Sequence, residues 1–71
     1  MPTVLLRLNG MRGPDDEERV RTALLAEPGV YGAVVSCEDG CAEVDIEDDV
    51  VSVDRIIEII ETAGFPAVLA G

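Results

Sequence analysis

The sequence predicts an α+β fold, a ferredoxin-like βαββαβ sandwich with two helices on one face of a four-stranded antiparallel sheet. Strand-like runs alternate with two stretches of helical spacing, and glycine or proline stands at the joints. The 71 residues suffice for one domain, residues 1–71. The core must be aliphatic, because 48% of the residues are hydrophobic and the chain has one Phe, one Tyr and no Trp.

The first half begins with a strand over residues 3–9, which is rich in aliphatic residues and lies between Pro2 and Gly10. A loop over residues 10–15 follows. Pro14 and the four acidic residues after it are typical of a helix start, because carboxylates favour the positive end of the helix dipole. We expect this helix to end near Glu27, before Pro28-Gly29. The predicted buried residues of this half are Val4, Leu6, Leu8, Val20, Ala23 and Leu24.

A hairpin is predicted next, with strands over residues 30–36 and 42–47. Cys37-Glu38-Asp39-Gly40-Cys41 predicts a three-residue loop with glycine in its last position. The alternation along the strands predicts which residues face inward. They are Ala33, Val35, Ala42, Val44 and Ile46.

The second helix is predicted over residues 53–63, with Ser52 as its N-cap and Gly64 just after its end. Its expected buried stripe contains Val53, Ile56, Ile57 and Ile60. Residues 65–69 complete the sheet as a short strand, and Pro66 favours an edge position for it.

Charge excludes several classes of partner. Fifteen acidic and five basic residues give a net charge of −10, which disfavours nucleic acid and anionic membrane surfaces. The acidic surface serves solubility or attracts cations or a basic protein. No targeting or membrane-spanning segment is recognisable, so we expect a cytoplasmic protein without membrane insertion. The oligomeric state cannot be read from the chain.

Several spaced motifs carry a resemblance to a known family. They run from the loop before the first helix to the end of the second helix: Gly10-Met11, Val20, Ala23-Leu24, Gly29-Val30, Ala42-x-Val44 and Ala63-Gly64-Phe65. With them the chain resembles the heavy-metal-associated domain, the fold of copper metallochaperones and of the N-terminal modules of metal-transporting ATPases. The resemblance implies a loop of the form G-M-x-C-x-x-C, in which two thiolates bind a soft metal ion.

The chain departs from that pattern at the metal ligands themselves. Gly13 and Asp16 stand where the family has its two cysteines. Glycine offers no ligand, and a carboxylate is a hard oxygen donor that soft metals rarely prefer. The resemblance implies that Met11 packs beneath the loop and does not bind the metal. We therefore expect a degenerate metal loop and no cofactor.

The only two cysteines, Cys37 and Cys41, form the second candidate site. If they faced each other across a three-residue loop, they could share Cu(I) or Zn, or form a disulfide. The alternation of side chains along the two strands argues against a shared site, because it points Cys37 toward the core and Cys41 toward the solvent-exposed face of the sheet. A buried Cys37 acting as a small hydrophobic residue is the other interpretation.

The sequence contains few candidate catalytic groups, since the chain has no His, no Lys and no recognisable nucleophile motif. We expect no enzymatic activity. The leading hypothesis is a domain with an interaction or regulatory role, or a degenerate metallochaperone, whose protein partner presents a basic surface. The alternative is a soft-metal-binding or thiol-redox protein that uses Cys37 and Cys41.

Overall fold

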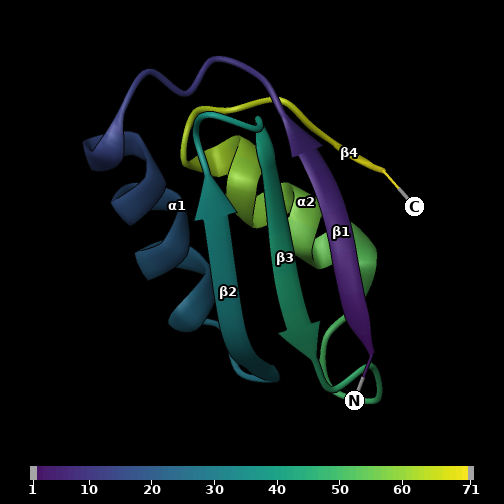
Figure 1. Cartoon of the computed structure of the whole chain (residues 1–71). Coiled ribbons are helices and arrows are strands. Elements are labelled where there is room, and N and C mark those ends of the chain that lie inside the picture. The colour runs from purple at the N-terminus through teal and green to yellow at the C-terminus, as the bar shows by residue number, and fades with distance from the viewer. Residues whose placement is uncertain (1, 71) are drawn as a thin grey trace.

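The structure is a computed structural model that describes residues 2–70. Its elements follow the predicted order βαββαβ, which confirms the fold class (Figure 1). They are β1 (Thr3–Leu8), α1 (Pro14–Leu25), β2 (Val30–Ser36), β3 (Cys41–Ile46), α2 (Val53–Thr62) and β4 (Ala67–Leu69). No helix within residues 2–70 is both long and apolar enough to cross a lipid bilayer.

All neighbouring strands are antiparallel, in the order β2-β3-β1-β4. Both helices cover one face of the sheet, and the other face is open to solvent (Figure 1). β4 lies at an edge, as Pro66 predicts, but it has three residues instead of five. Phe65 lies in the turn that follows α2 and not in β4: its N–H donates to the Ile60 carbonyl at 3.2 Å, and Gly64 adopts a φ of 110°.

The core lies between the helices and the covered face of the sheet. The predicted alternation in β1 and β3 is confirmed, and Ala23 of α1 is half-buried. In α2 the stripe is rotated relative to our prediction: Ile59 is buried, whereas Val53 and Ile57 are half-buried, because α1 also covers one side of α2. The buried residues are Val4, Leu6, Leu8, Val20, Leu24, Ala42, Val44, Ile46, Val51, Ile56, Ile59, Ile60, Phe65 and Ala67.

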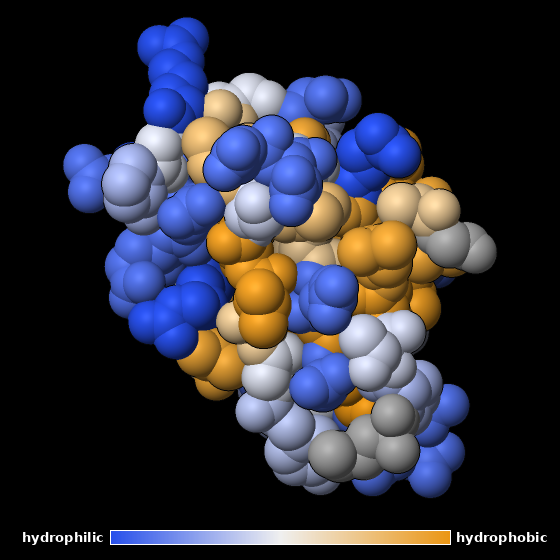
Figure 2. Space-filling model, in the orientation of Figure 1, coloured by the Kyte–Doolittle hydropathy of each residue, from blue (hydrophilic) through white to orange (hydrophobic). Residues whose placement is uncertain are grey.

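The open face of the sheet mixes apolar and hydrophilic residues (Figure 2). Leu5, Val34 and Val68 are exposed there, and Glu43 lies directly opposite both Leu5 and Val34. A carboxylate therefore lies between the exposed side chains of Leu5 and Val34.

Candidate functional site

The loop between β1 and α1 is anchored at its beginning by a backbone contact. The Asn9 N–H donates to the Pro66 carbonyl at 3.1 Å. Gly10 has a φ of 95°, a left-handed conformation that glycine adopts without strain. Met11 is half-buried and packs against the core. The loop therefore has an anchored beginning and an apolar residue that packs against the core.

Asp16 connects this loop to the first turn of α1. Its Oδ2 accepts a hydrogen bond from the Arg12 N–H at 2.9 Å. The Gly13 carbonyl accepts the N–H groups of Asp16 and Glu17 at 3.1 and 3.2 Å, so the helix begins directly after Gly13. The Asp16 carboxylate thus folds back over the helix start and satisfies a backbone donor that precedes it.

Gly13 leaves open space at the first ligand position of the resemblance. A Cβ placed on Gly13 would meet no heavy atom within 4 Å. Its φ of 176° is extended backbone, which any residue can adopt. Glycine is therefore not required here by the backbone. With no side chain at Gly13 and a hydrogen-bonded carboxylate at Asp16, these two positions offer no sulfur ligand.

The hairpin turn corrects our prediction about the two cysteines. The turn has four residues, Cys37 to Gly40, and Cys41 pairs with Ser36. The predicted three-residue loop with Cys37 opposite Cys41 is wrong. Two hydrogen bonds stabilise the four-residue turn: the Gly40 N–H donates to the Cys37 carbonyl at 3.3 Å, and Ser36 Oγ accepts the Asp39 N–H at 3.1 Å.

The two thiols lie in different surroundings. Both are free and half-buried. Cys41 lies on the open face, directly between Ser36 of β2 and Arg7 of β1. Cys37 lies in the turn, where its N–H donates to Glu17 Oε2 at 2.6 Å. Direct cross-strand opposition, the arrangement that would make a shared metal or a disulfide simplest, is therefore not formed.

Glu17 is a residue that the sequence analysis missed. It belongs to the acidic first turn of α1, which we interpreted through the helix dipole alone. In the structure it also joins α1 to the β2–β3 turn through Cys37, 20 residues away. No spacing in the sequence signals this contact, because it depends on how α1 lies against the end of β2.

The other carboxylates do not form a candidate metal centre with the loop. Glu18 forms an ion pair with Arg21 at 3.0 Å. Glu47, Asp48 and Asp49 place ligand oxygens within 4.8 Å of one another, but Asp48 and Asp49 are exposed in a turn after β3. The Glu47 carbonyl accepts the N–H groups of Val50 and Val51, as expected of a solvated turn.

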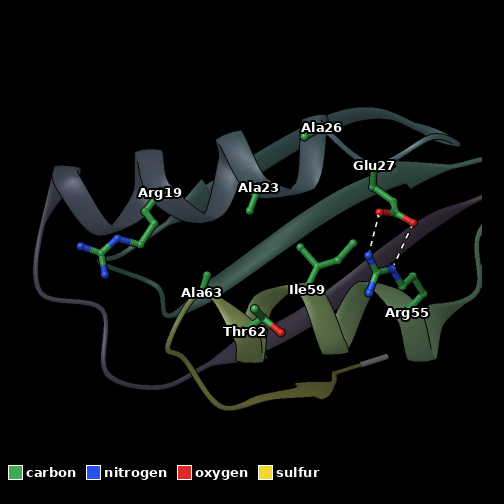
Figure 3. Close-up of a pocket in the computed structure, with 8 residues that line it drawn as sticks. All are labelled: Arg19, Ala23, Ala26, Glu27, Arg55, Ile59, Thr62 and Ala63. Atoms are coloured by element: carbon green, nitrogen blue, oxygen red, sulfur yellow. Dashed lines mark hydrogen bonds and ion pairs between the residues drawn. The ribbon is translucent and has the colours of Figure 1, made fainter.

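A groove of about 420 Å³ runs between α1 and α2 (Figure 3). Ala23 and Ile59 line it. At one end the guanidinium of Arg55 forms two hydrogen bonds of 3.1 Å with the carboxylate of Glu27. These bonds, and a further one to Glu58, raise the pKa of Arg55 above its usual range. Because the Glu27 carboxylate is paired with Arg55, these two residues clamp α1 to α2 at this end of the groove.

The sheet order and the two helices on one face define a domain of the ferredoxin-like class. The chain is 35% identical over 65 residues to copper chaperone CopZ of Staphylococcus saprophyticus, covering 92% of this chain and 96% of that protein. It therefore belongs to the heavy-metal-associated, copper-chaperone-like family. No protein-family model matches the chain.

Solved structures agree with this assignment. A copper-binding domain from HMA7, a P-type ATPase, is 30% identical with a TM-score of 0.98, covering 100% of this chain and 96% of that one. The CopZ metallochaperone is 30% identical with a TM-score of 0.91, covering 94% and 100%. Oxidized MerP from Ralstonia metallidurans CH34 is 27% identical with a TM-score of 0.93, covering 99% and 97%.

Proposed function

We propose that this family member is a non-enzymatic domain that does not carry Cu(I) through its loop and has an interaction or regulatory role. One observation carries the proposal. At the second ligand position, the Asp16 carboxylate accepts a hydrogen bond from the Arg12 N–H. At the first ligand position, Gly13 has no side chain. The hydrogen bond between Asp16 and Arg12 thus occupies an oxygen at the second ligand position.

The chemistry of Cu(I) supports this reading of the loop. Soft thiolate or thioether sulfur binds Cu(I) far better than a carboxylate oxygen does. The only sulfur in the loop is that of Met11, which packs against the core. One oxygen of the Asp16 carboxylate already accepts the Arg12 N–H and is directed toward the backbone. A Cu(I) ion at the loop would therefore find a poor oxygen ligand at Asp16 and no ligand at Gly13.

The charge of the chain supports a protein partner with a basic surface. The net charge is −10, and the start of α1 contributes Asp15, Asp16, Glu17 and Glu18. Such a surface raises the association rate with a basic patch and repels acidic ones. The absence of His and Lys from the sequence supports a non-enzymatic role. A cytoplasmic location remains a prediction of the sequence.

A Cu(I) competition titration tests the proposal. The reduced protein is added to Cu(I) held by a chromophoric chelator under anaerobic conditions. We expect the absorbance of the copper–chelator complex to stay unchanged, because the loop offers no thiolate. Withdrawal of copper with nanomolar or tighter affinity would contradict the proposal for the wild type. Retention of that affinity in a C37S/C41S variant would place the metal in the loop after all.

A second candidate is soft-metal binding or thiol redox chemistry at Cys37 and Cys41. It is favoured by the position of the turn, which lies against the loop end of the molecule: the Gly40 carbonyl accepts the Leu8 N–H at 2.8 Å. Both thiols are free and half-buried. Under this alternative the turn would take over the role of the loop, with Cu(I) or Zn as the ion.

Intact-mass measurements separate the two candidates. The protein is measured with and without reductant, and with added Cu(I) or Zn(II), beside the single variants C37S and C41S. The leading proposal expects the reduced, metal-free mass throughout. A mass lower by two hydrogens without reductant, or a metal adduct that either Ser variant removes, would establish the alternative.

A further inference from the structure

The strand β2 forms a free edge of the sheet that lacks the usual protection. It has seven residues, Val30–Ser36, none of them charged and none of them Pro. The opposite edge, β4, has only three residues and follows Pro66. Natural edge strands are commonly shortened, charged or broken by Pro to prevent further pairing. β2 has a single irregularity, at Tyr31, where its register with β3 shifts.

The hydrogen bonds of β3 show which backbone groups of β2 point outward. The Ile46 N–H donates to Pro2, and the Gly40 carbonyl accepts the Leu8 N–H, so even-numbered residues of this strand and its turn face β1. The odd-numbered residues of β3 therefore face β2, and their partners are Gly32, Val34 and Ser36. It follows that Ala33 and Val35, which alternate with these, direct their N–H and C=O groups to the free edge.

Glu17 marks the end of this free edge. Its carboxylate accepts the N–H of Cys37, two residues beyond Val35, at 2.6 Å. A side chain of α1 thus already pairs with one backbone donor beside β2. Among the hydrogen bonds of residues 2–70 that involve side chains, none reaches the backbone of Ala33 or Val35.

A groove of about 430 Å³ follows the same edge. One wall is α1, with Pro14, Glu17, Glu18 and Arg21, and the other is β2, with Ala33, Val34 and Val35. A strand added to β2 would lie along this groove, and alternate side chains would point toward α1 and toward the open face. The α1 side presents two carboxylates and one cation: Glu18 is paired with Arg21, whereas Glu17 has no cationic partner among the ion pairs of residues 2–70. The α1 side therefore keeps a net negative charge, and the open-face side presents Val34, which is 68% exposed.

We propose that the β2 edge binds an extended segment of a partner protein in which Lys or Arg alternates with apolar residues, pairing with the backbone of Ala33 and Val35. The basic side chains face Glu17 and Glu18, and the apolar ones cover Val34. Backbone hydrogen bonds supply affinity in this mode of recognition, and the alternating side chains supply specificity. The inference rests on the interaction role proposed above and gives it a surface separate from the loop.

A second copy of this chain fits the edge less well. Two copies would bring together net charges of −10 each. The β2 segment has no cation of its own to place opposite Glu17 and Glu18. Like charges across an interface disfavour association, whereas a basic segment gains from the same carboxylates. Charge complementarity therefore selects a basic partner.

The test is an NMR titration of the ¹⁵N-labelled protein, without metal, with a capped nine-residue peptide of alternating Val and Lys. We expect chemical-shift changes confined to residues 30–37 and the start of α1. Hydrogen exchange of the Ala33 and Val35 amides is expected to slow at least about tenfold at saturation. Two control peptides are not expected to bind: one N-methylated on the backbone nitrogens that face β2, and one with Glu in place of Lys.

Protein variants separate backbone pairing from charge. E18Q is expected to weaken peptide binding about two- to fivefold, and the matched neutralisation E61Q on α2 is expected to leave it unchanged. A33P removes one outward N–H and is expected to abolish binding. If A33P does not fold, the N-methylated peptide still tests backbone pairing.

Three results would overturn the proposal: equal binding of the N-methylated peptide, shift changes centred on β4 or the loop, or no binding of the Val/Lys peptide at millimolar concentration. If hydrogen-exchange protection of the Ala33 and Val35 amides rises with protein concentration in the absence of peptide, the partner at the β2 edge is a second copy of this chain and the proposed basic partner is wrong. Because no metal is present, failure here leaves the proposed function of the loop untouched, and only the Cu(I) titration decides that.

Discussion

The carboxylate of Asp16 accepts the backbone N–H of Arg12, with 2.9 Å between Oδ2 and N. This bond joins the loop to the first turn of α1, which otherwise begins at Gly13 without a side-chain cap. In the family pattern that the chain resembles, two thiolates from the same segment hold a metal ion. Here a carboxylate and a backbone donor close the loop, which is why we interpret the substitution at Asp16 as structural.

Replacing Asp16 by Ala should therefore destabilise the protein in the absence of any metal. We expect a loss of about 1 kcal/mol in the free energy of unfolding, typical of removing a carboxylate that caps backbone donors near a helix start. Urea unfolding followed by circular dichroism measures it. D15A is the matched control, since Asp15 lies in the same helical turn, is exposed and has no hydrogen bond of its side chain in the structure. Equal losses in D15A and D16A would show that only the helix dipole is involved.

The double variant G13C/D16C should acquire Cu(I) binding. Gly13 has open space and extended backbone, so a thiol fits there, and the start of α1 favours thiolates. We expect this variant to remove Cu(I) from a chromophoric chelator that the wild type leaves loaded. The single variants G13C and D16C should bind far more weakly, because each offers one thiolate. A double variant as inert as the wild type would mean that the loop geometry, and not the missing thiols, prevents binding.

Substituting Gly29 by Ala should be costly. Gly29 has a φ of 94°, and a Cβ there would lie 3.0 Å from side-chain atoms of Val50 and Val51. Left-handed backbone and overpacking each cost an L-residue free energy, so we expect about 2–4 kcal/mol less stability. Thermal unfolding measures the change.

Gly13 provides the control for Gly29. G13A should stay within about 1 kcal/mol of the wild type, because the loss of a good N-cap residue and the lower entropy of the unfolded chain oppose each other. A similar loss in G13A and G29A would contradict the assigned backbone conformations.

Leu24 and Leu25 offer a neighbouring pair that tests the packing of α1. Leu24 has no exposed surface, whereas Leu25 is 42% exposed. L24A should cost about 2–5 kcal/mol, a large part of the roughly 4–10 kcal/mol that a domain of this size holds, and L25A less than about 1 kcal/mol. Denaturant unfolding of both variants measures the difference. A larger loss in L25A would mean that α1 is rotated relative to the structure.

Much of the fold could be predicted because its signals are local. Pro14 and the acids after it start α1, Ser52 caps α2 through the Arg55 N–H, and Gly64 ends α2. The alternation of β3 gave its buried face correctly. The hairpin turn was predicted one residue too short, since Cys37-x-x-x-Cys41 is compatible with two turn lengths. The choice between them depends on hydrogen bonds made by Ser36 and Gly40.

The amino-acid sequence by itself determined the order of the elements, the edge position of β4 and the lack of thiols in the loop, because each depends on residue type and short-range spacing. Tertiary structure alone decided that Asp16 closes the loop, that Glu17 reaches Cys37, and that Cys37 and Cys41 do not face each other. It also decided that a groove lined by Glu17, Glu18 and Arg21 of α1 follows the β2 edge. The reason is physical: the register of paired strands and the placement of α1 against β2 arise from contacts between distant residues, which no local pattern specifies.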